Sequence, residues 1–285
     1  MTLVKLYKDT TEILQRAGAD SPAFDAIWII ESVTGCGRHE LIESPEKELS
    51  EDAKDKAFAL AQRRAQGEPL QYLTGNWEFM GRKFYVGEGV LIPRDDTEVV
   101  VRCVLNHLDK VSHIRPPQIL DLCSGSGIIA ITLKAMYPDA QVTAVEISPP
   151  ALHYLEKNAK ENNTVINILS GDIFECADSF EDGTFDLIIS NPPYVTKEDM
   201  ENLQREVRYE PELALYGGDD GCDFYRRIVP LYTQKLTKGG MLAFEYDSSQ
   251  ASTIGKLMTM YNFKNINIFD DLGGVHRAIN GTVFE

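Results

Sequence analysis

Residues 118–133 read QILDLCSGSGIIAITL. An apolar run containing one aspartate is followed by Ser-Gly-Ser-Gly and then by a second apolar run, an order that predicts a strand, a tight turn and a helix. Gly125 and Gly127 suit that turn, because a Cβ at either position would collide with a ligand or forbid the required φ. The stretch predicts a strand–loop–helix unit of an α/β sheet that binds a ligand at the loop.

The next predicted strand, residues 141–146, ends in a carboxylate. Glu146 lies about 20 residues after the glycine loop, the usual position for holding a ribose diol. Residues 125–130 also fit the G-x-G-x-x-A pattern of dinucleotide sites, and NAD and S-adenosylmethionine both carry that ribose. Asp121 favours the second, since a carboxylate suits the ammonium group of a methionine moiety and would repel a pyrophosphate. The alternatives are that Asp121 only orients the loop and that Glu146 is a solvated strand end.

Asn191-Pro192-Pro193-Tyr194 follows a second apolar run containing an aspartate, residues 185–190. That run predicts a buried strand, which places the tetrapeptide at its carboxyl end, where open α/β sheets bind ligands. The side-chain carbonyl of Asn191 and the backbone carbonyl of Pro192 offer two acceptors for one planar NH2 group. Tyr194 offers an aromatic face for a flat amide or base. We expect a site for chemistry on nitrogen; the alternative is a proline-rich turn that ends the strand.

The chain divides into a helical first part and an α/β second part. Residues 1–75 have helical periodicity, with capping residues expected at Ser21 and Ser50, and they predict a small bundle. Residues 76–92 read as a linking β-hairpin. From 93 to 285 strands and helices alternate, which predicts a doubly wound, mostly parallel sheet.

Composition and charge exclude several classes of function. The chain of 285 residues has 44 acidic and 28 basic side chains and a net charge of −16, which argues against a large nucleic-acid footprint. The pairs Arg63-Arg64 and Arg226-Arg227 read as solvated helix faces. Five cysteines without paired metal spacing predict reduced thiols and no metal site. No signal peptide or bilayer-spanning run is visible, which predicts a soluble, cytoplasmic protein without a membrane partner.

With these motifs in place, the chain resembles a known family over nearly its whole length: the S-adenosylmethionine-dependent protein-glutamine N5-methyltransferases called HemK or PrmC, which modify peptide-chain release factors. The segments Leu-Ile-Pro-Arg at 91–94 and Glu-Pro-Glu-Leu-Ala-Leu at 210–215 are family-restricted. Asn-Pro-Pro-Tyr is shared with adenine-N6 DNA methyltransferases and several RNA methyltransferases. Further matching segments are 68–75, 97–98, 121–127, 146–148, 171–174 and 217–218.

The resemblance implies a fold and an activity. Residues 93–285 would form a class I, Rossmann-like methyltransferase catalytic domain with a seven-stranded, mostly parallel sheet, preceded by a helical substrate-recognition domain at 1–75. The enzyme would transfer a methyl group from S-adenosylmethionine to the side-chain amide (N5) of the glutamine in the Gly-Gly-Gln motif of class I release factors, supporting translation termination. The partner would be the release factor, with no direct nucleic-acid partner.

Residue roles follow from the matched motifs. Asn191 and Pro192 would be catalytic and, with Pro193 and Tyr194, would bind the substrate. Asp172 matches an acidic residue that meets the adenine amino group, with Ile173 packing on the ring; its alternative is an Asx-turn at a strand end. The implied cofactor-binding residues are Asp121, Cys123, Ser124, Gly125, Ser126, Gly127, Glu146, Asp172, Ile173 and Asn191.

The chain departs from the family pattern at three places. Asp95-Asp96 stands where Pro-Glu is common, Cys123 where a glycine is frequent, and Tyr246-Asp247 where a glycine is common. Roles are left unassigned for Arg94, Asp95, Asp96 and Glu98.

Other classes of function stay open at this stage. An adenine-N6 or other nucleic-acid amino-group methyltransferase would use the same four residues but should bring a basic target-recognition region. A dinucleotide-dependent oxidoreductase would need only the glycine loop. A noncatalytic scaffold, with the helical bundle as its working part, would need neither pocket.

Overall fold

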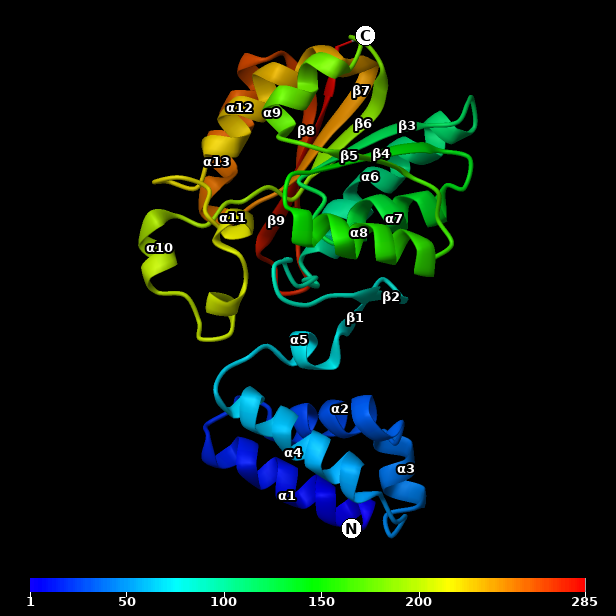
Figure 1. Ribbon diagram of the computed structural model, residues 1–285. Coiled ribbons are helices and arrows are strands. Elements are labelled where there is room, and N and C mark those ends of the chain that lie inside the picture. The colour runs from blue at the N-terminus through cyan, green and yellow to red at the C-terminus, as the bar shows by residue number, and fades with distance from the viewer. Residues whose placement is uncertain (285) are drawn as a thin grey trace. The chain divides into compact units, whose positions relative to one another are not determined.

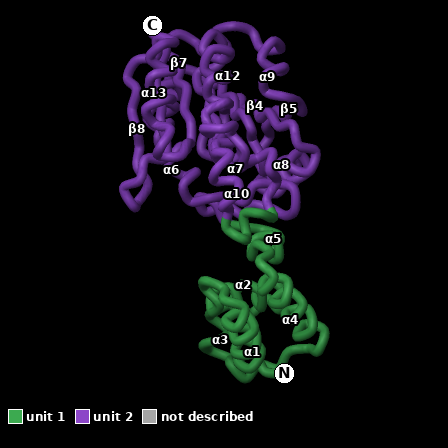
Figure 2. Tube along the Cα trace, turned by 90° about the vertical axis from the view of Figure 1, so that its left-hand side faces the viewer, with its two compact units in different colours: residues 1–77, 204–209 green, residues 78–203, 210–285 purple. Residues whose placement is uncertain are grey.

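The structure, a computed structural model, describes residues 1–284 and divides into two compact units (Figure 2). The first unit comprises Met1–Trp77 together with Gln204–Tyr209. The second comprises Glu78–Leu203 and the chain from Glu210 onward. Each unit has its own buried apolar clusters, as expected of a separately packed domain.

The first unit is a bundle of helices. They are α1 (Leu3–Arg16), α2 (Pro22–Thr34), α3 (Arg38–Glu43), α4 (Glu51–Ala65) and α5 (Leu70–Thr74). Apolar side chains such as Leu6 of α1 and Ile29 of α2 are fully buried in its core. The Ser50 hydroxyl accepts the Ala53 N–H at 3.2 Å, which is the predicted cap of α4. Ser21 precedes α2 as expected, but its hydroxyl makes no capping hydrogen bond.

Arg64 does not lie on a solvated helix face, so that prediction is wrong for it. Its side chain is 7% exposed and donates to Asp25 at 2.6 Å and to Glu206. The neighbouring Arg63 is 54% exposed, as predicted. A buried guanidinium needs such partners because an unpaired buried charge is costly. The segment 204–209, remote in sequence from the helices, is thereby held in the first unit.

A two-stranded sheet follows the bundle in the chain. It pairs β1 (Asn76–Phe79) with β2 (Arg82–Tyr85). The two residues between them, Met80 and Gly81, both have positive φ, of 48° and 73°. This is the backbone of a tight hairpin turn whose twist matches that of the strands.

The second unit contains one seven-stranded sheet. Its strands are β3 (Gln118–Leu122), β4 (Gln141–Glu146), β5 (Asn167–Ser170), β6 (Phe185–Ser190), β7 (Leu236–Glu245), β8 (Phe263–Asp270) and β9 (His276–Val283). Their order across the sheet is β5-β4-β3-β6-β7-β9-β8. All neighbours from β5 to β7 pair in parallel, whereas β9 runs antiparallel to both β7 and β8. The predicted α/β methyltransferase architecture is confirmed.

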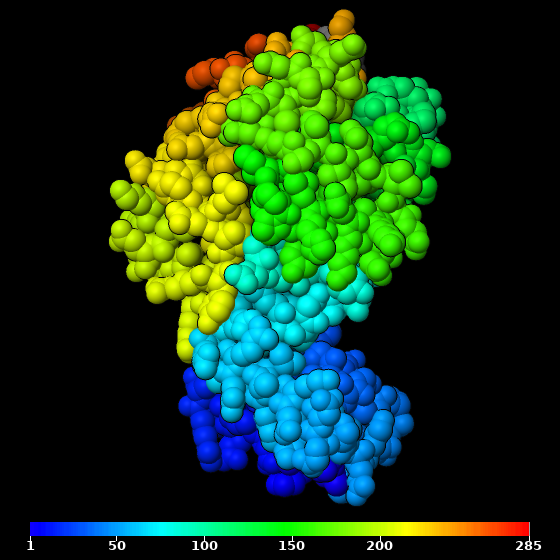
Figure 3. Space-filling view, in the orientation of Figure 1, coloured from blue at the N-terminus to red at the C-terminus, as the bar shows by residue number. Residues whose placement is uncertain are grey.

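Helices cover both faces of this sheet (Figure 1). One layer is α6 (Thr97–Ser112), α7 (Ile128–Met136) and α8 (Pro149–Glu161); the other is α9 (Ile173–Cys176), α12 (Asp223–Tyr232) and α13 (Ala251–Met260). The short helices α10 (Lys197–Glu201) and α11 (Glu212–Leu215) follow β6. Figure 3 shows the green segments around α8 and α9 and the yellow to orange segments of α12 and α13 at the surface of the second unit. Among residues 1–284, no helix has both the length and the apolar character to cross a membrane.

The strand order fixes where a ligand would bind. The chain moves outward from β3 to β5 and then returns to β6, so β3 and β6 are neighbours from which the chain departs in opposite directions. The crevice at the carboxyl ends of two such strands is the usual ligand site of open α/β sheets. Leu122 pairs with Ser190 at that edge, immediately before the glycine loop and the Asn191 tetrapeptide.

Candidate functional site

A cavity of about 260 Å³ lies at the carboxyl ends of β3, β4 and β6 within the second unit. Its walls include these residues predicted from sequence: Cys123, Ser124, Gly125, Ser126, Glu146, Asp172, Ile173, Asn191 and Pro193. The other predicted site residues, Asp121, Gly127, Pro192 and Tyr194, do not line the cavity. The glycine loop and the Asn191 tetrapeptide therefore both contribute residues to the wall of one cavity.

A larger hollow of about 1170 Å³ lies along α6, β8 and β9. It is lined by Asp95, Asp96 and Glu98 among others, but by none of the residues predicted to bind a cofactor or a substrate. Volume alone does not identify a site, whereas convergent polar groups in an enclosed space do. The smaller cavity is the candidate.

Asp121 lies fully buried beneath the glycine loop. Its Oδ2 accepts the Ala130 N–H at 3.2 Å in the first turn of α7, so the carboxylate does orient the loop. Its Oδ1 has no hydrogen-bond partner among the described residues. Burial raises the pKa of Asp121 to about 8, although hydrogen bonds from Ser124 and Ala130 partly oppose that shift. The unpaired oxygen is therefore a buried acceptor, on a residue that does not itself line the cavity.

The glycine loop needs small residues for two different reasons. Gly125 has φ +55°, and a Cβ there would meet no protein atom within 4 Å, so the position faces open space. Gly127 has φ +83°, and a Cβ there would lie 2.9 Å from the Ile131 side chain, so this glycine permits helix packing. Cys123 has φ +58°, a left-handed backbone that explains why a glycine suits this position.

Glu146 is held by three backbone N–H groups. Its Oε2 accepts from Gly125 at 2.7 Å, and its Oε1 accepts from Ile147 at 2.9 Å and from Ser148 at 2.8 Å. At 7% exposure it is not a solvated strand end. The carboxylate joins the loop after β3 to the start of α8 and leaves few lone pairs for a ligand.

Asp172 and its neighbours form another wall. Its Oδ1 accepts the Phe174 N–H at 2.8 Å, so the Asx-turn exists and the same side chain also lines the cavity. Ile173 is 5% exposed. Arg227 is exposed, as predicted for this helix face, and its guanidinium lies 3.3 Å from the Phe174 ring centroid and also lines the cavity.

Asn191 follows β6 directly and is part of the cavity wall. Its Nδ2 donates to the Thr97 hydroxyl oxygen at 3.3 Å, which leaves Oδ1 on the opposite side of the amide. Pro192 and Pro193 are buried. The Tyr194 hydroxyl donates to Glu245 Oε1 at 3.4 Å, and burial raises the pKa of Tyr194. The sequence analysis assigned no role to Thr97, which lies in the matching segment 97–98, or to Glu245.

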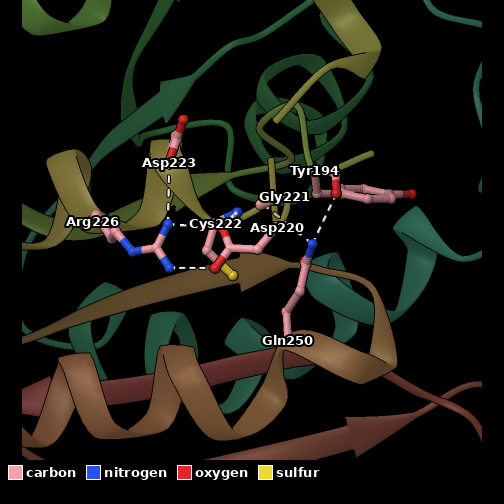
Figure 4. Close-up of polar contacts among 7 residues, drawn as sticks. All are labelled: Tyr194, Asp220, Gly221, Cys222, Asp223, Arg226 and Gln250. Carbon is pink, nitrogen blue, oxygen red and sulfur yellow. Dashed lines mark hydrogen bonds and ion pairs between the residues drawn. The ribbon is translucent and has the colours of Figure 1, made fainter. Parts of the chain in front are cut away.

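Gln250 links Tyr194, the last residue of the tetrapeptide, to the loop that precedes α12 (Figure 4). Gln250 Nε2 donates to the Tyr194 carbonyl at 2.8 Å and to the Gly221 carbonyl at 3.2 Å. A Cβ on Gly217 would lie 2.6 Å from the Pro193 carbonyl oxygen. These glycines therefore permit a close backbone approach that supports the tetrapeptide.

Two protein families match successive parts of this chain. Residues 5–75 match the family described as PrmC N-terminal domain, and residues 94–208 match the methyltransferase small domain. The release factor glutamine methyltransferases of Geobacter sulfurreducens and Koribacter versatilis are 37% and 35% identical to this chain over 99% of its length, and the matches cover 97% and 98% of theirs. The chain belongs to the release factor glutamine methyltransferase family.

As a member of that family the protein is a methyltransferase enzyme, which decides against the oxidoreductase and the scaffold. Among solved structures, the catalytic domain of hMettl16 in complex with a 3′UTR hairpin aligns with a TM-score of 0.55 and 13% identity. That alignment covers 83% of this chain and 82% of the other. It shows the shared fold.

The two family-restricted segments of release factor glutamine methyltransferases meet at one carboxylate. Glu210, whose side chain is 1% exposed, accepts the Ile92 N–H at 2.9 Å and pairs with Arg94. Arg94 and Ile92 both line the cavity. Two other residues without a role in the sequence analysis have partners as well: Asp96 pairs with Arg277 at 3.1 Å, and Glu98 pairs with Arg102 at 2.8 Å.

Glu210→Ala should loosen the cavity wall. The substitution leaves the Ile92 N–H and a half-buried guanidinium without their acceptor, so we expect a loss of about 1–3 kcal/mol in the free energy of unfolding. Hydrogen exchange at the Ile92 amide should accelerate. Glu212→Ala, an exposed change in the same segment, is the control. Unchanged protection at Ile92 in Glu210→Ala would contradict this account.

Proposed function

We propose that this enzyme transfers a methyl group from S-adenosylmethionine to the side-chain amide nitrogen (N5) of the glutamine in the Gly-Gly-Gln motif of class I peptide-chain release factors. The names of its relatives support the substrate. The observation that carries the chemistry is Asn191, whose amide lies in the cavity wall with its nitrogen bonded to Thr97. Its oxygen is then the end available to a substrate N–H. Because release factors act in the cytoplasm, we place the enzyme there.

The residues present fit this cofactor. Asp121 has a buried, unpaired oxygen that suits an ammonium group, and Gly125 presents open space where a side chain would obstruct a ligand. In the proposed arrangement Cys123, Ser124, Ser126 and Gly127 shape the loop around the ligand. Glu146 bonds the ribose with its remaining lone pair, while Asp172 and Ile173 meet the adenine. When bound, the cofactor supplies an electrophilic methyl group on a sulfonium.

The nucleophile in this reaction, the amide nitrogen of the substrate glutamine, is weak, so the protein must orient it toward the methyl carbon. A carboxamide nitrogen has its lone pair delocalised into the carbonyl, so it attacks only when that lone pair is turned toward the methyl carbon. Asn191 Oδ1 and the Pro192 carbonyl each accept one N–H of the substrate amide, which orients the nitrogen and eases its pyramidalisation. Pro193 in the cavity wall and the neighbouring Tyr194 confine the planar group. No strong general base is needed, since the nitrogen becomes acidic as the N–C bond forms and its proton passes to water.

The direct test is mass spectrometry of a release factor incubated with the enzyme and methyl-labelled S-adenosylmethionine. We expect one added methyl group on the glutamine of its Gly-Gly-Gln motif. Asn191→Ala should abolish the transfer and change the cofactor dissociation constant by no more than about tenfold, the cost of one polar contact. Asn202→Ala, at an exposed position after the tetrapeptide, should behave as wild type. Near-normal turnover in Asn191→Ala would refute the proposed hydrogen bonding of the substrate nitrogen. Methylation of nucleic acid instead would indicate an adenine-N6 or other nucleic-acid amino-group methyltransferase.

Asp121→Asn should weaken cofactor binding by about 10- to 100-fold, because a charge-assisted contact is lost. The pKa of Asp121 is about 8 without ligand, so its carboxyl is largely protonated at neutral pH. A cation favours the ionised form, and we therefore expect wild-type affinity to rise with pH up to about 8 and binding to release a proton. Calorimetry in buffers of different ionisation heat measures that release. Asp139→Asn, an exposed change, is the control; equal proton release by wild type and Asp121→Asn would contradict the assignment.

We further propose that the helical unit helps to recognise the protein substrate. A free amide side chain is too common to be selected by the cavity alone, and this unit presents large apolar side chains to solvent: Phe24 is 49% exposed and Ile42 is 72% exposed. Phe24 begins an aromatic row, with its ring 5.9 Å from that of Trp28.

Substituting Phe24 or Ile42 with serine should lower kcat/KM for a whole release factor far more than for a short Gly-Gly-Gln peptide. A whole release factor can contact these exposed side chains, whereas a short peptide cannot, so only the whole protein would lose apolar contacts. Ile114→Ser, an 84% exposed position in the second unit, is the matched control. Equal losses with protein and peptide would contradict this role.

A further inference from the structure

Residues 210–217, which include α11, contribute to the wall of the cavity and are fixed at both ends; we call them the α11 segment. At its start, Glu210 accepts the Ile92 N–H at 2.9 Å and pairs with Arg94. Both of these partners line the cavity themselves. The α11 segment adds three further residues to the wall, Pro211, Leu213 and Ala214.

The end of the α11 segment is hydrogen-bonded to the residue that follows the Asn191 tetrapeptide. The Val195 N–H donates to the Leu215 carbonyl at 2.8 Å, and the Gly217 N–H donates to the Val195 carbonyl at 2.9 Å. Val195 and Tyr216 thereby form a parallel bridge. The Leu215 side chain is buried. Because backbone bonds hold the α11 segment beside the tetrapeptide, its side chains form a fixed part of the cavity wall.

Among residues 1–284, two large apolar side chains both line this cavity and are exposed, Leu213 at 57% and Ile147 at 47%. A side chain with both properties lies where the cavity opens to solvent. Ile147 directly follows Glu146 and donates its N–H to that carboxylate, so it lies on the side proposed for the cofactor. Leu213 belongs to the segment bonded next to the tetrapeptide, and it therefore lies on the side proposed for the substrate amide.

The proposed substrate reaches the cavity as part of a polypeptide, so the residues beside its glutamine must pass this opening. In Gly-Gly-Gln the two residues before the glutamine have no Cβ, and such residues let a backbone approach a surface closely. A leucine fixed in the wall can pack flat against them, which removes its exposed apolar surface from water. A methyl group on either glycine would hold the chain away from Leu213 and draw the glutamine back from Asn191.

We propose that Leu213 is a specificity-determining residue that packs against the two glycines preceding the substrate glutamine. The inference rests on the proposed function and deepens it by naming the side chain that distinguishes this glutamine from others. The helical unit would then recognise the whole release factor, whereas Leu213 would recognise the motif itself.

Calorimetry of short peptides with the enzyme saturated in S-adenosylhomocysteine is the first arm of the test. The peptides contain Gly-Gly-Gln, Ala-Gly-Gln or Gly-Ala-Gln. Wild type should bind the first at least about tenfold more tightly than either of the others, because a Cβ prevents close approach. Leu213→Ala should weaken binding of the first about tenfold, the scale expected when a leucine side chain is no longer buried. Its preference over at least one alanine peptide should fall below about threefold, since the vacated space accepts the added methyl group.

The second arm compares variants of the two exposed side chains. Leu213→Ala should leave the dissociation constant of S-adenosylhomocysteine within about twofold, whereas Ile147→Ala should raise it, because each side chain contacts a different ligand. In kinetics, Leu213→Ala should lower kcat/KM by the same factor for a whole release factor and for the short peptide, unlike the substitutions at Phe24 and Ile42. Leu272→Ala, at a fully exposed leucine outside the cavity wall, is the matched control and should behave as wild type.

Two results would overturn the inference. One is a Leu213→Ala enzyme that still discriminates the three peptides as wild type does. The other is weaker binding of S-adenosylhomocysteine by Leu213→Ala with peptide binding intact, which would place Leu213 against the cofactor. If the peptides bind in the expected order but no methyl group reaches any of them, the proposed function fails and the contact with the glycines stands.

Discussion

The parallel pairing of β3 with β6 is the constraint on which the site depends. Leu122 and Ser190 are partners at the carboxyl edge of the sheet, and the two functional segments begin with the residues that follow them. All six residues of β6 are buried, so the strand cannot shift its register without moving polar groups into the core. The glycine loop and Asn191 are therefore both fixed in the wall of one cavity.

The acidic residues of the site serve structure and chemistry together. Glu146 accepts three backbone N–H groups, Asp172 caps α9 through the Phe174 N–H, and Asp121 bonds the first turn of α7. The structural interpretations of Asp121 and Asp172 are correct in geometry, whereas Glu146 is not a solvated strand end; Glu146 and Asp172 also face the cavity. Holding a carboxylate with backbone amides preorganises it, so the two interpretations do not exclude each other.

Local patterns predicted most of the fold because they depend on neighbours in the sequence. The apolar run 185–190 coincides with β6, residues 141–146 with β4, and the glycine loop precedes α7 at Ile128. The motif chemistry likewise placed Asn191 and Gly125 in one site. Such features follow from the spacing of apolar residues, from the backbone conformations that glycine allows and from the order of strands along the chain, all of which can be read from a single sequence.

What the sequence could not predict are partners brought together by the fold. Arg64 bonds Glu206 across 142 positions and Arg94 bonds Glu210 across 116, and nothing in either segment specifies the other. Arg227 is exposed as predicted, but its contact with the Phe174 ring, from a segment remote in sequence, could not be foreseen. Glu245, at the end of an apolar strand, gave no signal that the Tyr194 hydroxyl would bond it.

The most direct test of the account is a crystal structure of the enzyme with S-adenosylhomocysteine and a Gly-Gly-Gln peptide. The account predicts the glutamine nitrogen within about 3 Å of both Asn191 Oδ1 and the Pro192 carbonyl oxygen, on a line to the cofactor's sulfur. A glutamine side chain bound elsewhere, or an Asn191 tip with no room for a planar group between it and the sulfur, would contradict it.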